Sequence, residues 1–133
     1  MPRILLVEDD KYLRAVVAQM LADGGHTVTE AEDGRIAVAI YRPEVFDLIV
    51  MDLIMPEKDG MESITELKRK FPAVKIIAMT SGGQFAVKSE YLRMAKCIGA
   101  ADVLKKPFSQ DTLLTMVDRM MREGPAATQP GVA

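Results

Sequence analysis

The feature that most constrains the fold of this chain is a repeated alternation of short apolar runs with segments of helical periodicity. The runs have the length and composition of β-strands and cover residues 3–7, 26–30, 47–51, 74–79 and 101–104. The periodicity predicts helices over residues 11–23, 35–41 and 87–98, one that opens at residues 59–62, and one that follows Ser109. Strands that alternate with helices in this way indicate a parallel sheet covered by helices on both faces.

Local signals mark the ends of several of these helices. Gly24-Gly25 is a typical C-terminal signal for the first helix. Asp33 and Ser109 are candidate N-caps, and Asp59-Gly60-Met61-Glu62 has the spacing of a capping box. Cys97 falls in the fourth predicted helix, where we expect it to pack as a small apolar residue.

The predicted fold class is α/β, with a doubly wound five-stranded parallel sheet and five helices. Sheets of this size commonly have the flavodoxin-like order 2-1-3-4-5, which makes the first and third strands neighbours. The runs near Leu5 and Ile49 are apolar throughout, as expected of strands that are buried on both faces. Ligands of such sheets bind outside the carboxyl ends of the strands.

The composition fits one domain without disulfides. With 133 residues, the chain has the size of a single domain, which we place at residues 1–123. Residues 124–133 lack periodicity and are either a disordered tail or a truncated linker. A single cysteine, no run long enough for a membrane span and no signal-peptide layout predict a cytoplasmic protein without membrane contact. The net charge of -2, without a basic stripe, argues against direct binding to nucleic acid.

Charged and polar residues follow the predicted strands at one edge of the sheet. Asp52 ends the third apolar run, and Glu8, Asp9 and Asp10 follow the first. Because the first and third strands are neighbours in the predicted order, these carboxylates converge. Thr80 and Lys106 end the fourth and fifth strands and reach the same edge.

This set of side chains predicts phosphoryl chemistry. Adjacent carboxylates repel each other, and a hard divalent cation removes that cost. Mg2+ favours one or two carboxylates together with waters and phosphate oxygens. A carboxylate such as Asp52 can also attack phosphorus and form an acyl phosphate. Lys106 could neutralise charge on the phosphoryl oxygens, and the Thr80 hydroxyl could hydrogen-bond to one of them.

Four segments in this order resemble the receiver domain of response regulators in two-component signalling, over about residues 3–122. They are Ile4-Leu5-Leu6-Val7-Glu8-Asp9-Asp10, Asp47-Leu48-Ile49-Val50-Met51-Asp52-Leu53-Ile54-Met55-Pro56 with Asp59-Gly60, Thr80-Ser81, and Lys105-Lys106-Pro107-Phe108. The resemblance implies that Asp52 accepts a phosphoryl group from a histidine kinase or a phosphotransfer protein. The domain would be a signalling module that catalyses only its own phosphorylation and dephosphorylation.

The resemblance also implies roles for the surrounding residues. Mg2+ would be held by Asp9, Asp52 and the backbone carbonyl of Ile54, with Glu8 acting through water. For Asp10, a metal-site role and a helix N-cap are equally open. Thr80 and Lys106 would bind the phosphoryl oxygens. The Lys106-Pro107 peptide bond would be cis, a geometry that X-Pro bonds adopt at modest cost.

The output would be a changed surface of the fourth helix, fifth strand and fifth helix, read by a downstream protein or used for a homodimer. Two departures from the family pattern, at Val103 and in the stretch Ser81–Lys88, bear on this output. Val103 stands where receivers usually carry Tyr or Phe, so a rotating ring cannot report the state of Thr80. The stretch Ser81–Lys88 is long and glycine-containing, which predicts a remodelled loop. Ile54 has no polar group to position water, which predicts slow self-dephosphorylation.

Two rival functions stay open at the level of sequence. One is a small phosphohydrolase with an aspartyl-phosphate intermediate, although such enzymes usually carry Asp-x-Asp after the first strand and this chain has Glu8-Asp9-Asp10. The other is a binding module that keeps the receiver fold and acts without phosphorylation. Turnover of phosphate monoesters would favour the first rival, and failure to label with any donor would favour the second.

Overall fold

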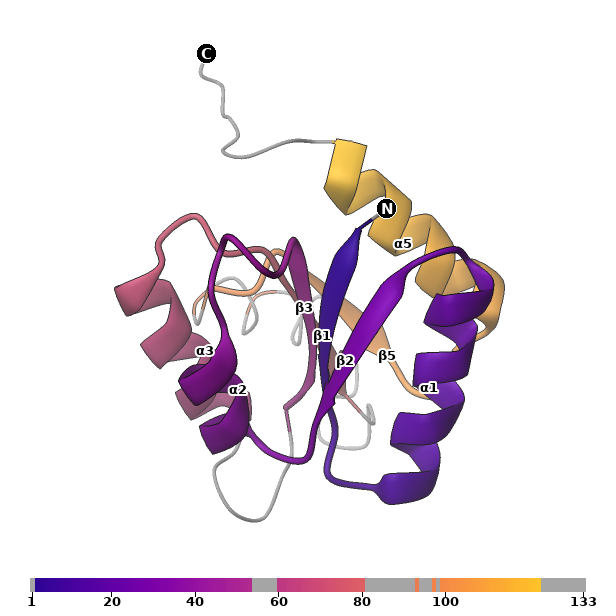
Figure 1. Cartoon of the computed structure of the whole chain (residues 1–133), viewed down its shortest axis with the longest axis horizontal. Helices are drawn as coiled ribbons and strands as arrows, with labels where there is room; N and C mark the ends of the chain where they lie inside the picture. The colour runs from indigo at the N-terminus through magenta and orange to yellow at the C-terminus, as the bar shows by residue number, and fades with distance from the viewer. Residues whose placement is uncertain (1, 54–59, 81–92, 94–96, 98, 123–133) are drawn as a thin grey trace.

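The computed structural model describes residues 2–53, 60–80, 93, 97 and 99–122. Within these residues, five strands alternate with helices, and the labels follow Figure 1. The strands are β1 (Arg3–Val7), β2 (Thr27–Ala31), β3 (Leu48–Asp52), β4 (Ile76–Thr80) and β5 (Asp102–Lys105). The helices are α1 (Lys11–Asp23), α2 (Gly34–Ile40), α3 (Gly60–Lys70) and α5 (Gln110–Arg122).

All neighbouring strands pair in parallel, in the order β2-β1-β3-β4-β5. This confirms the predicted flavodoxin-like topology. The register sets Val7 beside Met51 and Asp52 beside Met79, so the carboxyl ends of the three central strands lie at one level. The loops that follow these strands therefore start at the same edge of the sheet, the lower edge in Figure 1.

Helices cover both faces of the sheet (Figure 1), and an apolar layer lies on each side of it. Successive strand residues point to opposite faces, and both faces of β1, β3 and β4 are buried. Leu5 and Ile49 belong to the layer on the side of α2 and α3, which also contains Ile64 and Leu67. The opposite layer lies against α1 and α5; it includes Ile4, Leu6, Val17, Leu21, Leu113 and Val117. Continuous apolar runs are required because each central strand contributes to both layers.

The caps of the helices agree with the sequence where they are described. The Asp33 side chain accepts hydrogen bonds from the backbone N–H groups of Arg35 and Ile36 and caps α2. Ser109 Oγ accepts from the N–H of Thr112, 3.1 Å away, and caps α5. After α1, Gly25 has φ of 90°, a backbone angle that glycine adopts without a steric penalty. Asp59 of the predicted capping box lies outside the described residues.

The fourth predicted helix falls largely outside the described residues. Arg93 and Cys97 are helical, in agreement with the prediction. Cys97 is exposed, so the expectation that it packs as a small apolar residue is wrong. In the sequence, the spacing of the apolar residues at about 3.6 residues per turn leaves Cys97 outside the apolar face of the predicted helix, so the usual burial of cysteine does not apply to it. Among the described helices, none is long and apolar enough to cross a membrane.

Candidate functional site

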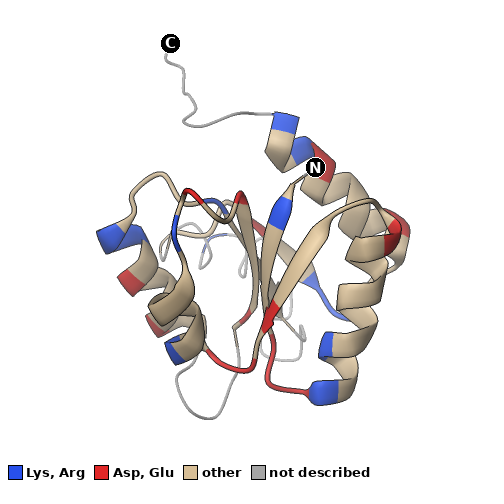
Figure 2. Ribbon diagram, in the orientation of Figure 1, with Lys and Arg blue, Asp and Glu red and all other residues tan. Residues whose placement is uncertain are grey.

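Three carboxylates meet at the carboxyl edge of the sheet. Glu8 and Asp9 follow β1, Asp52 ends the neighbouring β3, and one oxygen from each lies within 4.8 Å of the others. Glu8 and Asp52 are buried, whereas Asp9 is exposed. Figure 2 shows acidic residues along this lower edge, in the turns after β1 and β2. A cluster of hard oxygen donors with one open side fits Mg2+, which keeps several waters and takes one or two carboxylates.

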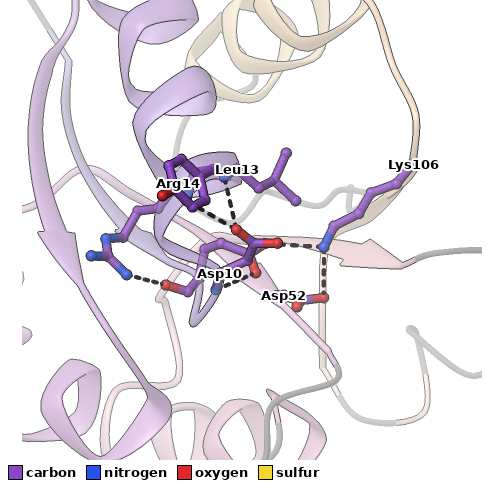
Figure 3. A network of polar contacts seen from close by, with 7 residues as sticks. Asp10, Leu13, Arg14, Asp52 and Lys106 are labelled. Carbon is purple, nitrogen blue, oxygen red and sulfur yellow. Dashed lines mark hydrogen bonds and ion pairs between the residues drawn. The ribbon is translucent and has the colours of Figure 1, made fainter.

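Lys106 reaches this cluster from the end of β5. Its Nζ lies 3.0 Å from Glu8 Oε1 and 3.3 Å from Asp52 Oδ1, and Figure 3 shows the side chain extended between the two carboxylates. The backbone N–H of Lys106 donates to the Thr80 carbonyl over 2.6 Å, which fixes the end of β5 against β4. The Lys106-Pro107 bond is cis, as predicted.

The acidity of Glu8 is shifted by its surroundings. Burial raises the pKa of its carboxyl from 4.5 to about 7, and the nearby Asp52 charge acts in the same direction. The Lys106 ammonium and the Asp10 N–H oppose this rise in pKa without cancelling it. A bound divalent cation would favour the ionised form, because an opposite charge lowers a carboxyl pKa. Mg2+ binding and Glu8 deprotonation are therefore linked.

Asp10 acts as the N-cap of α1. Its Oδ1 accepts hydrogen bonds from the N–H groups of Tyr12 (2.9 Å) and Leu13 (3.1 Å). Of the two roles left open by the sequence, the structure shows the capping one. Asp10 does not belong to the group of carboxylates within 4.8 Å of one another, which consists of Glu8, Asp9 and Asp52.

Of the remaining predicted residues, the structure describes Thr80 and Val103 but not Ile54 or the stretch Ser81–Lys88. Thr80 ends β4 and is fully buried. Val103 is buried in β5, in the apolar layer shared with α3, so the position of the family's aromatic residue holds a short core side chain. Ile54 and the stretch Ser81–Lys88 lie outside the described residues, so neither the carbonyl ligand nor the remodelled loop is tested.

Two residues that support the site were missed in the sequence. The Arg14 guanidinium donates to the Glu8 carbonyl over 2.8 Å, and Figure 3 shows it beside the loop after β1. Gly60 starts α3 so close to β3 that an added Cβ would lie 2.2 Å from the Asp52 carbonyl oxygen. Arg14 is spaced like any other surface residue of an amphipathic helix, so no pattern singles it out. The glycine of the Asp59-Gly60 pair could have suggested such close packing.

Comparisons with known proteins identify the family of the chain. The model of the response regulator receiver domain family matches residues 4–118, and the chain belongs to this family. It is 35% identical over 128 residues to the transcriptional regulatory protein TcrA of Mycobacterium tuberculosis, covering 96% of this chain and 49% of that protein. The chain therefore spans about half the length of this relative.

Solved structures give the same fold. The chemotaxis protein CheY4 of Vibrio cholerae superposes with a TM-score of 0.80 at 31% identity, covering 90% of this chain and 98% of that one. The response regulator protein TrrA of Thermotoga maritima, solved in complex with Mg2+-BeF, superposes with a TM-score of 0.76 at 27% identity, covering 90% and 99%. Receiver domains are signalling domains, and the match to this family is consistent with a role of the chain in two-component signalling.

Proposed function

We propose that this domain accepts a phosphoryl group on Asp52 from a histidine kinase or a phosphotransfer protein, with Mg2+ in the carboxylate cluster. The observation that carries the proposal is the position of Asp52, buried at the end of β3 within reach of both Lys106 and the Glu8 and Asp9 oxygens. A buried carboxylate beside a cation and a candidate metal site has the surroundings that an attacking oxygen needs.

In the proposed step, an Asp52 carboxylate oxygen attacks the phosphorus of a phosphohistidine. The new O–P bond forms as the N–P bond breaks, and the imidazole nitrogen keeps the electron pair and takes a proton from solvent. The Lys106 ammonium, 3.3 Å from Asp52 Oδ1, neutralises charge on the phosphoryl oxygens. The Thr80 hydroxyl, at the end of the neighbouring strand, hydrogen-bonds to one of these oxygens. When bound, Mg2+ supplies further neutralisation of that charge.

Phosphorylation adds about -1.5 to -2 charges at the end of β3. The proposed output is a population shift of the surface around residues 87–98, β5 and α5, read by a downstream protein or by a second copy of the chain. Val103 is buried at the usual aromatic position, so the shift does not depend on a rotating ring there. The domain catalyses only its own phosphorylation and dephosphorylation.

Binding of a phosphoryl mimic tests the proposal. Beryllofluoride with Mg2+ should bind the parent protein and raise its midpoint of thermal unfolding, since a ligand of the folded state stabilises it. Asp52→Asn replaces the negatively charged carboxylate by a neutral amide and should abolish this rise in the unfolding midpoint. If the Asn variant responds as the parent does, Asp52 is not the acceptor.

The rival functions give different results in the same set of experiments. A small phosphohydrolase would turn over phosphate monoesters many times per protein molecule, whereas a receiver takes up one phosphoryl group from a donor such as acetyl phosphate. A binding module that acts without phosphorylation would bind Mg2+ but take no label from any donor. Single labelling that requires Asp52 supports the proposal over both.

A further inference from the structure

We propose that Arg14 is a positioning residue for the Mg2+ site, because it fixes the backbone that carries Asp9. This inference rests on the proposed function, since it concerns the metal site of the same phosphoryl acceptor. Arg14 touches none of the reacting groups: its role is to hold the turn between β1 and α1 in place.

The Arg14 side chain connects three elements. It projects from α1, its Nη1 donates to the Glu8 carbonyl at the end of β1 over 2.8 Å, and its Nε lies 3.2 Å from Glu30 Oε1 on β2. Only 15% of the side chain is exposed, against 47% for Glu30. A partly buried guanidinium that uses two different N–H groups in two directions has a fixed orientation. Figure 3 shows the Arg14 guanidinium reaching back to the turn after β1.

These contacts constrain Asp9 from both sides. Before it, the Glu8 carbonyl is held by Arg14, and the Glu8 N–H donates to the Ala31 carbonyl over 3.1 Å. After it, the Asp10 N–H donates to Glu8 Oε2 over 3.1 Å, and Asp10 caps α1. Among the described residues, no hydrogen bond or ion pair of the Asp9 side chain itself occurs. The place of this carboxylate within the cluster therefore depends on the backbone of the turn, which Arg14 holds together with the Glu8 and Asp10 side chains.

Two effects of Arg14 on Mg2+ act in opposite directions. Its positive charge repels the cation and weakens binding, whereas its hold on the turn strengthens binding. A lysine keeps the charge but cannot span both the Glu8 carbonyl and Glu30, because an ammonium on a flexible stem lacks the rigid fork of a guanidinium. A methionine removes both the charge and the donors. The pair Arg14→Lys and Arg14→Met therefore separates positioning from charge.

The test measures the Mg2+ dissociation constant of each variant by titration calorimetry in the absence of any phosphoryl donor. We expect Arg14→Lys to raise this constant about tenfold, the lower end of what outer partners of metal sites contribute. Arg14→Met should raise it less, because loss of the repelling charge offsets part of the lost positioning. Glu30→Gln keeps an acceptor oxygen for Arg14 and should have a smaller effect. Arg42→Lys is the matched control: Arg42 donates to backbone carbonyls of Ala39 and Tyr41 at the end of α2 and should leave the constant unchanged.

Acetyl phosphate labelling adds a readout that lost stability alone would not produce. In Arg14→Lys, the Mg2+ concentration for half-maximal labelling should rise about tenfold, while the rate at saturating Mg2+ stays within about twofold of the parent. An unchanged Mg2+ dissociation constant in Arg14→Lys would contradict the inference. If Arg14→Met then bound Mg2+ more tightly than the parent, Arg14 would act only through its charge; if it did not, Arg14 would have no effect on the site. If the parent itself binds no Mg2+, the proposed function fails first and the inference with it.

Discussion

Lys106 connects the two buried carboxylates of the site, Glu8 and Asp52. A cation next to a metal site weakens binding of the metal, yet the same cation favours transfer of a negatively charged phosphoryl group. The two properties of the site therefore respond in opposite directions to a change at this residue. A variant that removes the charge can separate them.

Lys106→Met should bind Mg2+ at least as tightly as the parent but accept the phosphoryl group about 100-fold more slowly, since removal of one preorganised donor typically costs that much. Calorimetry measures the first quantity, and labelling by acetyl phosphate at saturating Mg2+ measures the second. Lys105→Met serves as control, because within the described part of the chain this adjacent lysine makes no ion pair with the carboxylate cluster. Labelling of Lys106→Met at the parental rate would contradict the role given to Lys106.

Glu8 makes the stability of the metal-free protein depend on pH. In the folded state its pKa is about 7, above the ordinary value of 4.5. At pH values between these two, the folded state therefore keeps a proton that the unfolded state has released. The stability from this group is complete below pH 4.5 and is lost as the pH rises through 7, at about 1.4 kcal/mol per unit of pKa difference. Thermal unfolding across this window should show the loss in the parent and a flatter profile in Glu8→Gln. Addition of Mg2+ should stabilise the parent more above the window than below it; identical profiles for the two proteins would contradict this account.

At the scale of elements, the start of α3 determines how closely this helix packs on β3. The Gly60 N–H donates to the Leu53 carbonyl over 2.8 Å, and a Cβ at Gly60 would meet backbone atoms of Asp52 and Leu53 at 2.2 and 2.6 Å. Backbone cannot rotate away as a side chain can. The glycine therefore lets α3 begin directly behind Asp52, the proposed phosphoryl acceptor.

Gly60→Ala should lower the free energy of unfolding by about 2–3 kcal/mol, as overpacked cores do, and should also weaken Mg2+ binding because the end of β3 shifts. Gly24→Ala is the matched control, since the three atoms nearest to its Cβ would all belong to the side chain of Leu114, which lies 2.5 Å away and can move. Urea unfolding gives both stabilities. An equal decrease in the free energy of unfolding in the two variants would show that the contact with β3 does not matter more than the contact with Leu114.

The N-cap of α1 can be separated from the metal site by two substitutions of Asp10. Asparagine caps a helix about as well as aspartate, whereas alanine costs about 1 kcal/mol. If capping is the main role of Asp10, Asp10→Asn should keep both the stability and most of the Mg2+ affinity, and Asp10→Ala should lose about 1 kcal/mol of stability. A loss of Mg2+ affinity in the Asn variant as large as that in Asp9→Asn would instead place Asp10 among the metal ligands.

For the molecule as a whole, the strand order could be predicted because apolar strands and one-sided helices alternate regularly along the sequence. Each central strand is apolar on both faces, and each intervening segment has one apolar face, so few topologies bury all of them. Strand bounds differed by one or two residues, as for the fourth run, where the strand starts at Ile76 instead of Val74. Cys97 was misplaced because the prediction followed the usual burial of cysteine and not the helical spacing, which leaves Cys97 outside the apolar positions of that segment.

The part of the candidate site that could be predicted is the set of residues that the order of the strands brings to one edge of the sheet. Asp9, Asp52 and Lys106 each lie at or just after the end of a strand, so the order of strands was enough to place them at one edge. The supporting contact of Arg14 with a carbonyl was not predictable, because it depends on side-chain direction and has no signature in the spacing of residue types. The glycine at position 60 could suggest close packing, but not that the contact is with the end of β3.

The central claim is that Asp52 is the one residue that accepts the phosphoryl group, and that it does so with Mg2+. Intact-mass measurement after incubation with acetyl phosphate tests it most directly. The account predicts a gain of one phosphoryl group that requires Mg2+, is removed by hydroxylamine as acyl phosphates are, and is absent in Asp52→Asn. Labelling of the Asn variant to the parental level, or labelling of the parent that persists after Mg2+ is chelated, would contradict it.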